Sequence, residues 1–198
     1  MREALALVLL LSLNACKKAA EETAASTNAT IVAGLELLPY VEASGEFSTV
    51  GPADWKVKED STYGASVLML GPGTARFPRS VSIGIGGYPN KVDKSADPKW
   101  YYDGYSMIES YNTVVPFEKR VIGGVEVDYY EFDRPFRRIH ERKVIYTMRE
   151  SVAIVRVPGG FYRISHHAPV EIYRETYPVF EAVVANFKLG PRRAAKAP

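Results

Sequence analysis

The sequence is poor in the residues that most often bind metals or form covalent intermediates. It contains one cysteine, Cys16, and three histidines, His140, His166 and His167. A single thiol excludes an internal disulfide and any zinc or iron–sulfur site built from cysteines. The formal net charge of +2 provides no broad field for nucleic acid, so we expect no nucleic-acid partner. The longest apolar run, residues 4–13, falls short of the roughly 20 residues that a membrane-spanning helix needs.

That apolar run is instead typical of a secretory signal peptide. It follows a short charged start, and we interpret residues 1–15 as the signal segment. The segment Leu13-Asn14-Ala15-Cys16 resembles the bacterial lipobox, with an aliphatic residue three positions before the cysteine and a small residue directly before it. The Cys16 thiol would take a diacylglyceryl group, and two or more acyl chains hold a protein stably at a membrane. The alternative is an ordinary signal peptide with Cys16 near its cleavage site by chance.

The residues after Cys16 predict a tether and a location. Residues 17–30 are small and polar, as in a flexible linker, and we assign residues 16–46 to the lipidated cysteine and its tether. Residues 31–50 are more apolar, which leaves open whether they add an edge strand or lie on the domain surface. Lys17 and Lys18 follow Cys16, so the residue directly after the cysteine is not an aspartate. By resemblance to proteobacterial lipoproteins, this favours a lipid-anchored protein of the outer membrane facing the periplasm.

Residues 47–189 have the composition of one globular domain, because the chain is 46% hydrophobic and rich in tyrosine. Alternating or apolar runs predict strands at 64–70, 80–85, 119–122, 125–133, 143–148, 152–157 and 161–166. Gly123-Gly124 predicts a two-residue hairpin loop, and the glycines of residues 84–87 are interpreted as turn residues. The prediction is an α+β fold with an antiparallel sheet of about six strands covered by helices.

Two helices are expected. Asp97-Pro98 has the pattern of a cap followed by proline at the first helical position, and Trp100, Met107 and Tyr111 would then share one face. Near the C-terminus, an apolar stripe runs along a second helix, made of Tyr173, Tyr177, Phe180, Val184 and Phe187. Pro178 lies inside this pattern, so this helix either begins near Tyr177 or kinks there, and residues 179–188 are its secure part. Residues 190–198 form a basic tail.

Together these features resemble a known superfamily. They are Trp55 after a proline-containing lead-in, the Gly123-Gly124 hairpin, the segment Val-Pro-Gly-Gly-Phe-Tyr at 157–162, and Pro-Val-Phe-Glu-Ala-Val-Val-Ala-Asn-Phe-Lys at 178–188. This order is similar to the PsbP-like α/β/α sandwich superfamily, which includes a photosystem II subunit, a Ran-binding import factor and many bacterial lipoproteins. The resemblance covers about residues 47–189. Members do unrelated things, so it implies a fold and little about function.

Few residues form a pattern suited to catalysis. His166 and His167 are neighbours on a predicted strand end, so their side chains face apart and are badly placed to share a metal. His140 could join one of them if the strands paired in register, but surface or strand-end histidines are the more common explanation. The alternating carboxylates Glu126 and Asp128, and Glu131 and Asp133, are interpreted as the solvent-facing side of a sheet. We expect no metal, no cofactor and no enzyme activity.

Two surfaces remain as candidates for binding. Basic residues cluster at Arg134, Arg137, Arg138, Arg142 and Lys143, and could contact headgroups or a partner, although a solvated loop explains them as well. The aromatic residues of 100–111, among them Trp100, Tyr101 and Tyr105, could line a groove, although core packing is the simpler explanation.

The leading hypothesis is a membrane-anchored envelope lipoprotein that binds or scaffolds an unidentified envelope protein without catalysis. The alternative is a small-ligand-binding or hydrolytic domain that uses residues 100–111 together with His140 or His166.

Overall fold

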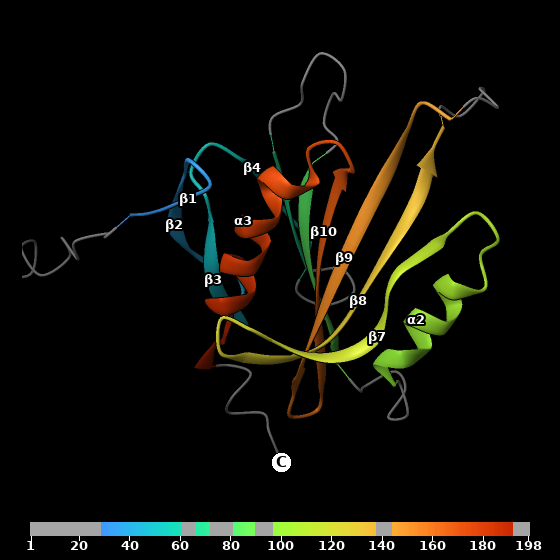
Figure 1. The fold of residues 1–198 in the computed structure, drawn as a ribbon. Coiled ribbons are helices and arrows are strands. Elements are labelled where there is room, and N and C mark those ends of the chain that lie inside the picture. Colours follow the sequence, from blue (N-terminus) through green and yellow to red (C-terminus); the bar gives the residue numbers. More distant parts are fainter. Residues whose placement is uncertain (1–28, 61–65, 72–80, 90–96, 138–143, 192–198) are drawn as a thin grey trace, which may run out of the picture.

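A seven-stranded antiparallel sheet forms the centre of the computed structural model, which describes residues 29–60, 66–71, 81–89, 97–137 and 144–191 (Figure 1). The strand order is β4-β5-β6-β10-β9-β8-β7. These strands are β4 (Lys56–Asp60), β5 (Ser66–Leu70), β6 (Ser82–Pro89), β7 (Asn112–Ile122), β8 (Val125–Phe136), β9 (Tyr146–Val157) and β10 (Gly160–Pro169). The α+β class and the antiparallel pairing are confirmed, and the predicted number of strands was too low.

In the large sheet β4 was not predicted, and the segments 143–148 and 152–157, predicted as two strands, contribute to the single strand β9. A second, four-stranded sheet was not predicted either. Its order is β1-β2-β3-β11, and its strands are β1 (Thr30–Val32), β2 (Leu35–Val41), β3 (Phe47–Pro52) and β11 (Lys188–Leu189). Leu37 and Phe47 of this sheet are 2% and 0% exposed, because they pack into the main core. The assignment of residues 30–46 to a tether was therefore wrong, since β1 and β2 belong to the folded domain, while residues 16–28 lie outside the described residues.

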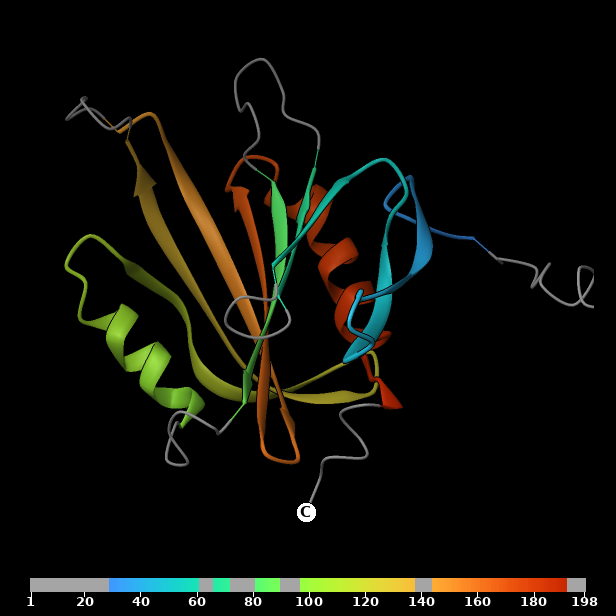
Figure 2. The same cartoon turned by 180° about the vertical axis from the view of Figure 1, so that it is seen from behind.

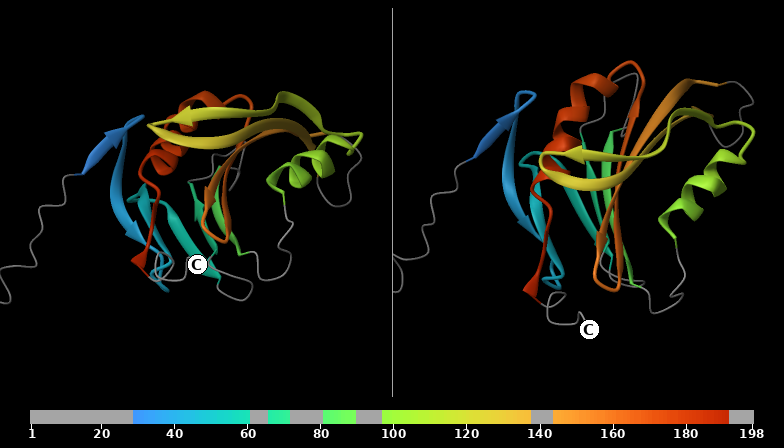
Figure 3. Two further views of the ribbon diagram at one scale, coloured as in Figure 1. Left: turned by 90° about the horizontal axis from the view of Figure 1, so that it is seen from below. Right: turned by 60° about the horizontal axis from the view of Figure 1, so that its bottom comes forward.

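The helix α3 (Tyr173–Ala185) lies between the two sheets (Figures 1 and 3). The predicted stripe is confirmed as the inward side of the helix, where Phe180 and Val184 are fully buried. The helix starts at Tyr173 with Pro178 inside it, so it does not begin near Tyr177. It ends at Ala185 rather than at residue 188, because β11 leaves the helix to pair with β3. The pairing joins the end of the chain to the second sheet.

The helix α2 (Pro98–Ser106) packs on the other face of the large sheet, beside β7 and β8 (Figure 2). Its predicted cap is confirmed, since the Asp97 side chain accepts a hydrogen bond from the Lys99 amide at 3.0 Å. The face of Trp100 and Met107 is exposed, with 70% and 79% of each residue accessible. Three tyrosines of the helix face the sheet instead, where they contact Tyr130, Phe132 and Phe161 of the strands; they are Tyr101, Tyr102 and Tyr105.

Two glycine-rich segments show what the sequence pattern could and could not predict. Gly123 and Gly124 have φ angles of +56° and +87°, as expected of the two-residue hairpin loop between β7 and β8. The glycines at 84, 86 and 87 are not turn residues, because β6 continues through them and pairs with β10 along its whole length. The strand pairing decides this, and it depends on residues some 80 positions away in the sequence.

Candidate binding groove

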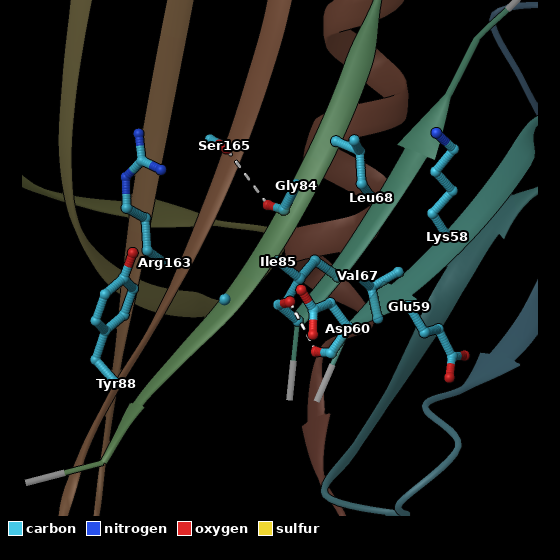
Figure 4. A pocket seen from close by; sticks show the side chains of 12 residues that line it. Lys58, Glu59, Asp60, Val67, Leu68, Gly84, Ile85, Tyr88, Arg163 and Ser165 are labelled. Carbon is cyan, nitrogen blue, oxygen red and sulfur yellow. Dashed lines mark hydrogen bonds between the residues drawn. The ribbon is translucent and has the colours of Figure 1, made fainter. Parts of the chain in front are cut away.

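A groove of about 540 Å³ lies over β4, β5, β6 and β10, on the face of the large sheet opposite α3 (Figure 4). Side chains alternate between the faces of a strand, so Ile83 and Ile85 enter the core under α3 while Gly84 and Gly86 face the groove. The strand register places Leu68 beside Gly84, and Gly84 beside Ser165. The floor of the groove therefore consists of two glycines, one serine and one leucine.

The two glycines are not required by the backbone. Both have φ outside the left-handed region, where glycine is favoured. A Cβ on Gly86 would lie 3.6 Å from the nearest atom of the Tyr88 ring, which is an ordinary contact. A Cβ on Gly84 would lie 3.1 Å from the Ser165 hydroxyl, which is tight. Glycine inside a strand weakens it and often marks a place where another molecule approaches the backbone closely. Gly86 fits that description, because it leaves the groove floor without a side chain although neither its backbone conformation nor its neighbours require glycine.

One side of the groove is formed by Arg163 and Tyr88. Arg163 donates a hydrogen bond to the carboxylate of Glu150, and the two side chains are 16% and 4% exposed. Burial alone would lower the pKa of the Arg163 guanidinium, but the charge of Glu150 and the nearby Tyr130 hydroxyl hold that pKa above its ordinary value. The guanidinium therefore stays charged, and the carboxylate of Glu150 compensates its charge. Tyr88 is held by stacking on Phe161, with ring centroids 5.0 Å apart.

The opposite side of the groove is the edge strand β4. Lys58 extends from it at the border of the groove, and Asp60 lies at the end of the strand (Figure 4). Glu59 points away toward the second sheet, where it accepts hydrogen bonds from the Tyr40 hydroxyl and, at 3.3 Å, from the Ala43 amide. Within the described residues Lys58 makes no ion pair, and this border carries both its ammonium group and the carboxylate of Asp60.

The histidines predicted to face apart do so, but neither is a surface residue. His166 is fully buried beneath α3, with its Nε2 2.9 Å from the Thr176 hydroxyl. Burial, and to a smaller extent His167, lowers the pKa of His166 to about 3. His167 lies on the groove side of the sheet, 3.7 Å from the Glu150 carboxylate. His140 lies outside the described residues.

The structure does not bring His166 together with the aromatic residues of α2, because the large sheet separates them. His166 contacts Tyr173 and Phe180 of α3 on one face. Trp100, Tyr101 and Tyr105 line a smaller pocket of about 170 Å³ on the other face, together with Gly104 and Ile108 of the same helical region. A shared site of His166 and residues 100–111 is therefore not formed.

The basic residues suggested by the sequence are only partly described. Arg137 is exposed. Arg134 is half-buried, and its guanidinium lies 3.5 Å from Nδ1 of His167. Arg138, Arg142 and Lys143 lie outside the described residues. Arg134 therefore has a contact within the sheet, and Arg137 alone of the described pair is exposed.

Of the four alternating carboxylates, Glu126 is exposed as predicted and Asp133 is half-buried, but Asp128 and Glu131 are buried. Asp128 is 1% exposed and pairs with Lys119 at 3.0 Å and with Arg156 at 2.7 Å. Glu131 is 7% exposed and accepts hydrogen bonds from the hydroxyls of Tyr129 and Tyr173. Burial raises the pKa of both tyrosines, and the hydrogen bonds to Glu131 raise it further, so the hydroxyls keep their protons. These carboxylates stabilise the interior of the domain.

Within the described part of the chain, no three or more histidine, cysteine, aspartate or glutamate side chains are grouped to hold a metal ion. Nor does any helix there have the length and apolar character to cross a membrane. Lys58, Gly86 and Arg163 were not predicted to be site residues from the sequence. The signal in the sequence was the alternation Ile83-Gly84-Ile85-Gly86, which indicates a strand with no side chains on one face.

The sequence matches no known protein family and no curated protein. Its structure is similar to that of the Ran-binding protein Mog1p of Saccharomyces cerevisiae, with a TM-score of 0.52 and 14% identity over 78% of this chain and 96% of Mog1p. Cyanobacterial PsbP of Synechocystis gives a TM-score of 0.46 and 11% identity, over 77% of this chain and 92% of that chain.

Two further solved structures are also similar to this chain. LpqN of Mycobacterium tuberculosis, described as involved in cell envelope biogenesis, gives a TM-score of 0.45 and 10% identity, over 83% of this chain and 99% of LpqN. A protein of Bacteroides thetaiotaomicron gives 0.47 and 17% over 76% of this chain, which spans only 47% of that protein. The likeness to Mog1p is one of fold alone, and it agrees with the α+β architecture described above.

Proposed function

We propose that the chain is a lipid-anchored, non-catalytic binding module of the bacterial cell envelope, and that its groove holds a partner protein. The observation that supports this most directly is the bare floor at Gly86, where neither backbone nor packing requires glycine. A strand that leaves out a side chain at a tolerant position loses stability, and close approach of another molecule explains that loss.

The anchor is supported by the N-terminal sequence. Residues 4–13 and the lipobox-like segment ending at Cys16 favour acylation, and residues 17–29 then connect the anchor to β1. A flexible linker of this length has a mean end-to-end distance of about 20 Å and an extended reach of about 45 Å. The groove would therefore work within a few nanometres of the membrane, which we assign to the outer membrane, facing the periplasm.

Metabolic labelling with palmitate tests the anchor. Wild-type protein is expected to incorporate the label and to fractionate with membranes, because its cysteine carries acyl chains. A Cys16→Ser variant should do neither. Label that persists in this variant would show that the lipid is attached elsewhere or that the labelling is unspecific.

Crosslinking in intact envelopes tests the groove. Gly86→Leu places a side chain over the floor, and its first carbon meets only an ordinary contact with Tyr88. Gly104→Leu is the matched control, since a Cβ there meets no atom within 4 Å and the residue lines the α2 pocket. We expect Gly86→Leu to lose the partner crosslink and Gly104→Leu to keep it. The reverse result would place the partner at the α2 pocket and not in the groove.

A further inference from the structure

The strand β4 has a free edge beside the groove. It pairs with β5 on one side, and within the described residues no strand pairs with its other side. All five of its residues, Lys56–Asp60, are exposed. An edge strand presents unpaired backbone N–H and C=O groups at the spacing of a strand, so an extended chain can pair with it. The edge and the groove belong to one continuous surface.

The side chains of β4 divide into two sets by alternation. Lys56, Lys58 and Asp60 lie on the groove face, at the register positions beside Leu70, Leu68 and Ser66 of β5. Val57 and Glu59 lie on the other face, where Val57 is 39% exposed and Glu59 is held by Tyr40 and Ala43. The free edge therefore offers two lysines, with Asp60 at the end of the strand, on one face and an exposed apolar side chain on the other.

We propose that β4 accepts an extended segment of the partner protein as an additional strand, in which acidic residues alternate with apolar ones. This inference rests on the proposed function as a binding module. An added strand would lie about 4.8 Å from β4, and its alternate side chains would come within about 5.5 Å of Lys56 and Lys58.

Lys56 and Lys58 would make the edge of β4 selective for an acidic strand. Charged residues on an edge strand discourage pairing with apolar strands, which would have to desolvate them. The same lysines attract carboxylates at the opposing positions, because oppositely charged cross-strand pairs are favourable and like charges are not. An anionic lipid would satisfy the lysines but would leave the backbone groups of β4 unpaired. The free edge therefore favours a polypeptide over a membrane surface.

The test uses the full-length chain with the Cys16→Ser change and a capped synthetic peptide in which glutamate alternates with valine. A second peptide carries lysine in place of glutamate. The double variant Lys56→Glu with Lys58→Glu should bind the acidic peptide at least tenfold more weakly in titration calorimetry, and should gain binding to the basic peptide. A variant that merely unfolds cannot gain binding. Hydrogen exchange of the β4 amides should slow when the acidic peptide binds.

The double variant Arg174→Glu with Lys188→Glu is the control, because it makes the same change in net charge at exposed positions of α3 and β11. It should bind like wild type. Unchanged affinity in the β4 variant, or binding without slower exchange in β4, would overturn strand addition. Binding to phosphatidylglycerol vesicles in place of the peptide would overturn it too.

The outcomes separate this inference from the proposed function. If the peptide fails to bind while Gly86→Leu still removes the native crosslink, the groove is the binding site and strand addition is wrong. If the peptide protects β4 while Gly86→Leu leaves the crosslink intact, strand addition stands and the role of the groove floor is wrong.

Discussion

Gly86→Ala should make the protein more stable and a poorer binder. The backbone there is not left-handed, and the new methyl group meets Tyr88 at 3.6 Å, an ordinary van der Waals distance. Replacing glycine inside a strand then gains about 0.5–1 kcal/mol, mainly because the unfolded chain has less conformational freedom to lose. For a domain of this size the gain corresponds to a rise in Tm of about 1–4 °C. The methyl group also stands on the groove floor, so the crosslink to the partner should weaken.

Urea and thermal unfolding of the full-length Cys16→Ser protein measure the first effect, and envelope crosslinking measures the second. Gly84→Ala is the paired control, because its methyl group would lie 3.1 Å from the Ser165 hydroxyl and should gain less stability or none. A loss of stability in Gly86→Ala would show that the strand needs this glycine for its own packing. A gain of stability with undiminished crosslinking would show that the bare floor has no role in binding.

Three other changes test the interior of the domain by urea unfolding. Glu131→Leu should lower the unfolding free energy by about 1–3 kcal/mol, because two buried tyrosine hydroxyls lose their acceptor; an unchanged value would refute these bonds. Gly123→Ala should cost about 2–4 kcal/mol, since φ is +56° and the new Cβ would lie 2.2 Å from that of Ala185; a Tm within 1 °C of wild type would contradict this. The pKa of His166 is lowered to about 3 by burial, so as pH falls the unfolded state takes up a proton first and about 2 kcal/mol of stability is lost between pH 7 and 5. His166→Gln should remove that loss, leaving the contribution of His167, whose pKa burial also lowers; an unaltered pH dependence would contradict the assignment.

Features set by a few neighbouring residues could be predicted from the sequence. The Gly123-Gly124 loop, the cap at Asp97 and the stripe through Phe180 depend on local backbone preferences and on one helical period. The antiparallel α+β class followed from the number and spacing of such segments. Each of these is present in the structure as expected.

Features that depend on distant partners could not be predicted. Residues 30–41 alternate weakly, and they become strands because β3 and the late strand β11 complete their sheet. Asp128 was placed in solvent, but Arg156 approaches it from β9 and allows it to be buried. The outward position of Trp100 follows from the stacking of Tyr101, Tyr102 and Tyr105 on sheet residues. In each case the counterpart lies far away in the sequence.

The groove illustrates the same limit. Its floor joins Leu68, Gly84 and Ser165 from three strands, and only the register of β5, β6 and β10 brings them side by side. Two glycines in the sequence indicate a turn as readily as a bare strand face. The pairing along β6 decides between these interpretations.

Because the groove lies on a sheet, residues that meet the partner alternate with residues that hold the core. Leu68 is followed by the buried Met69, and Arg163 by the buried Ile164. Substitutions at every second position can therefore change what is bound and leave folding intact. A one-residue insertion in β6 would exchange the two sets and abolish both properties together. In a deep mutational scan, tolerance along these strands should rise and fall with a period of two, and the phase of that oscillation would identify the binding face without any knowledge of the partner.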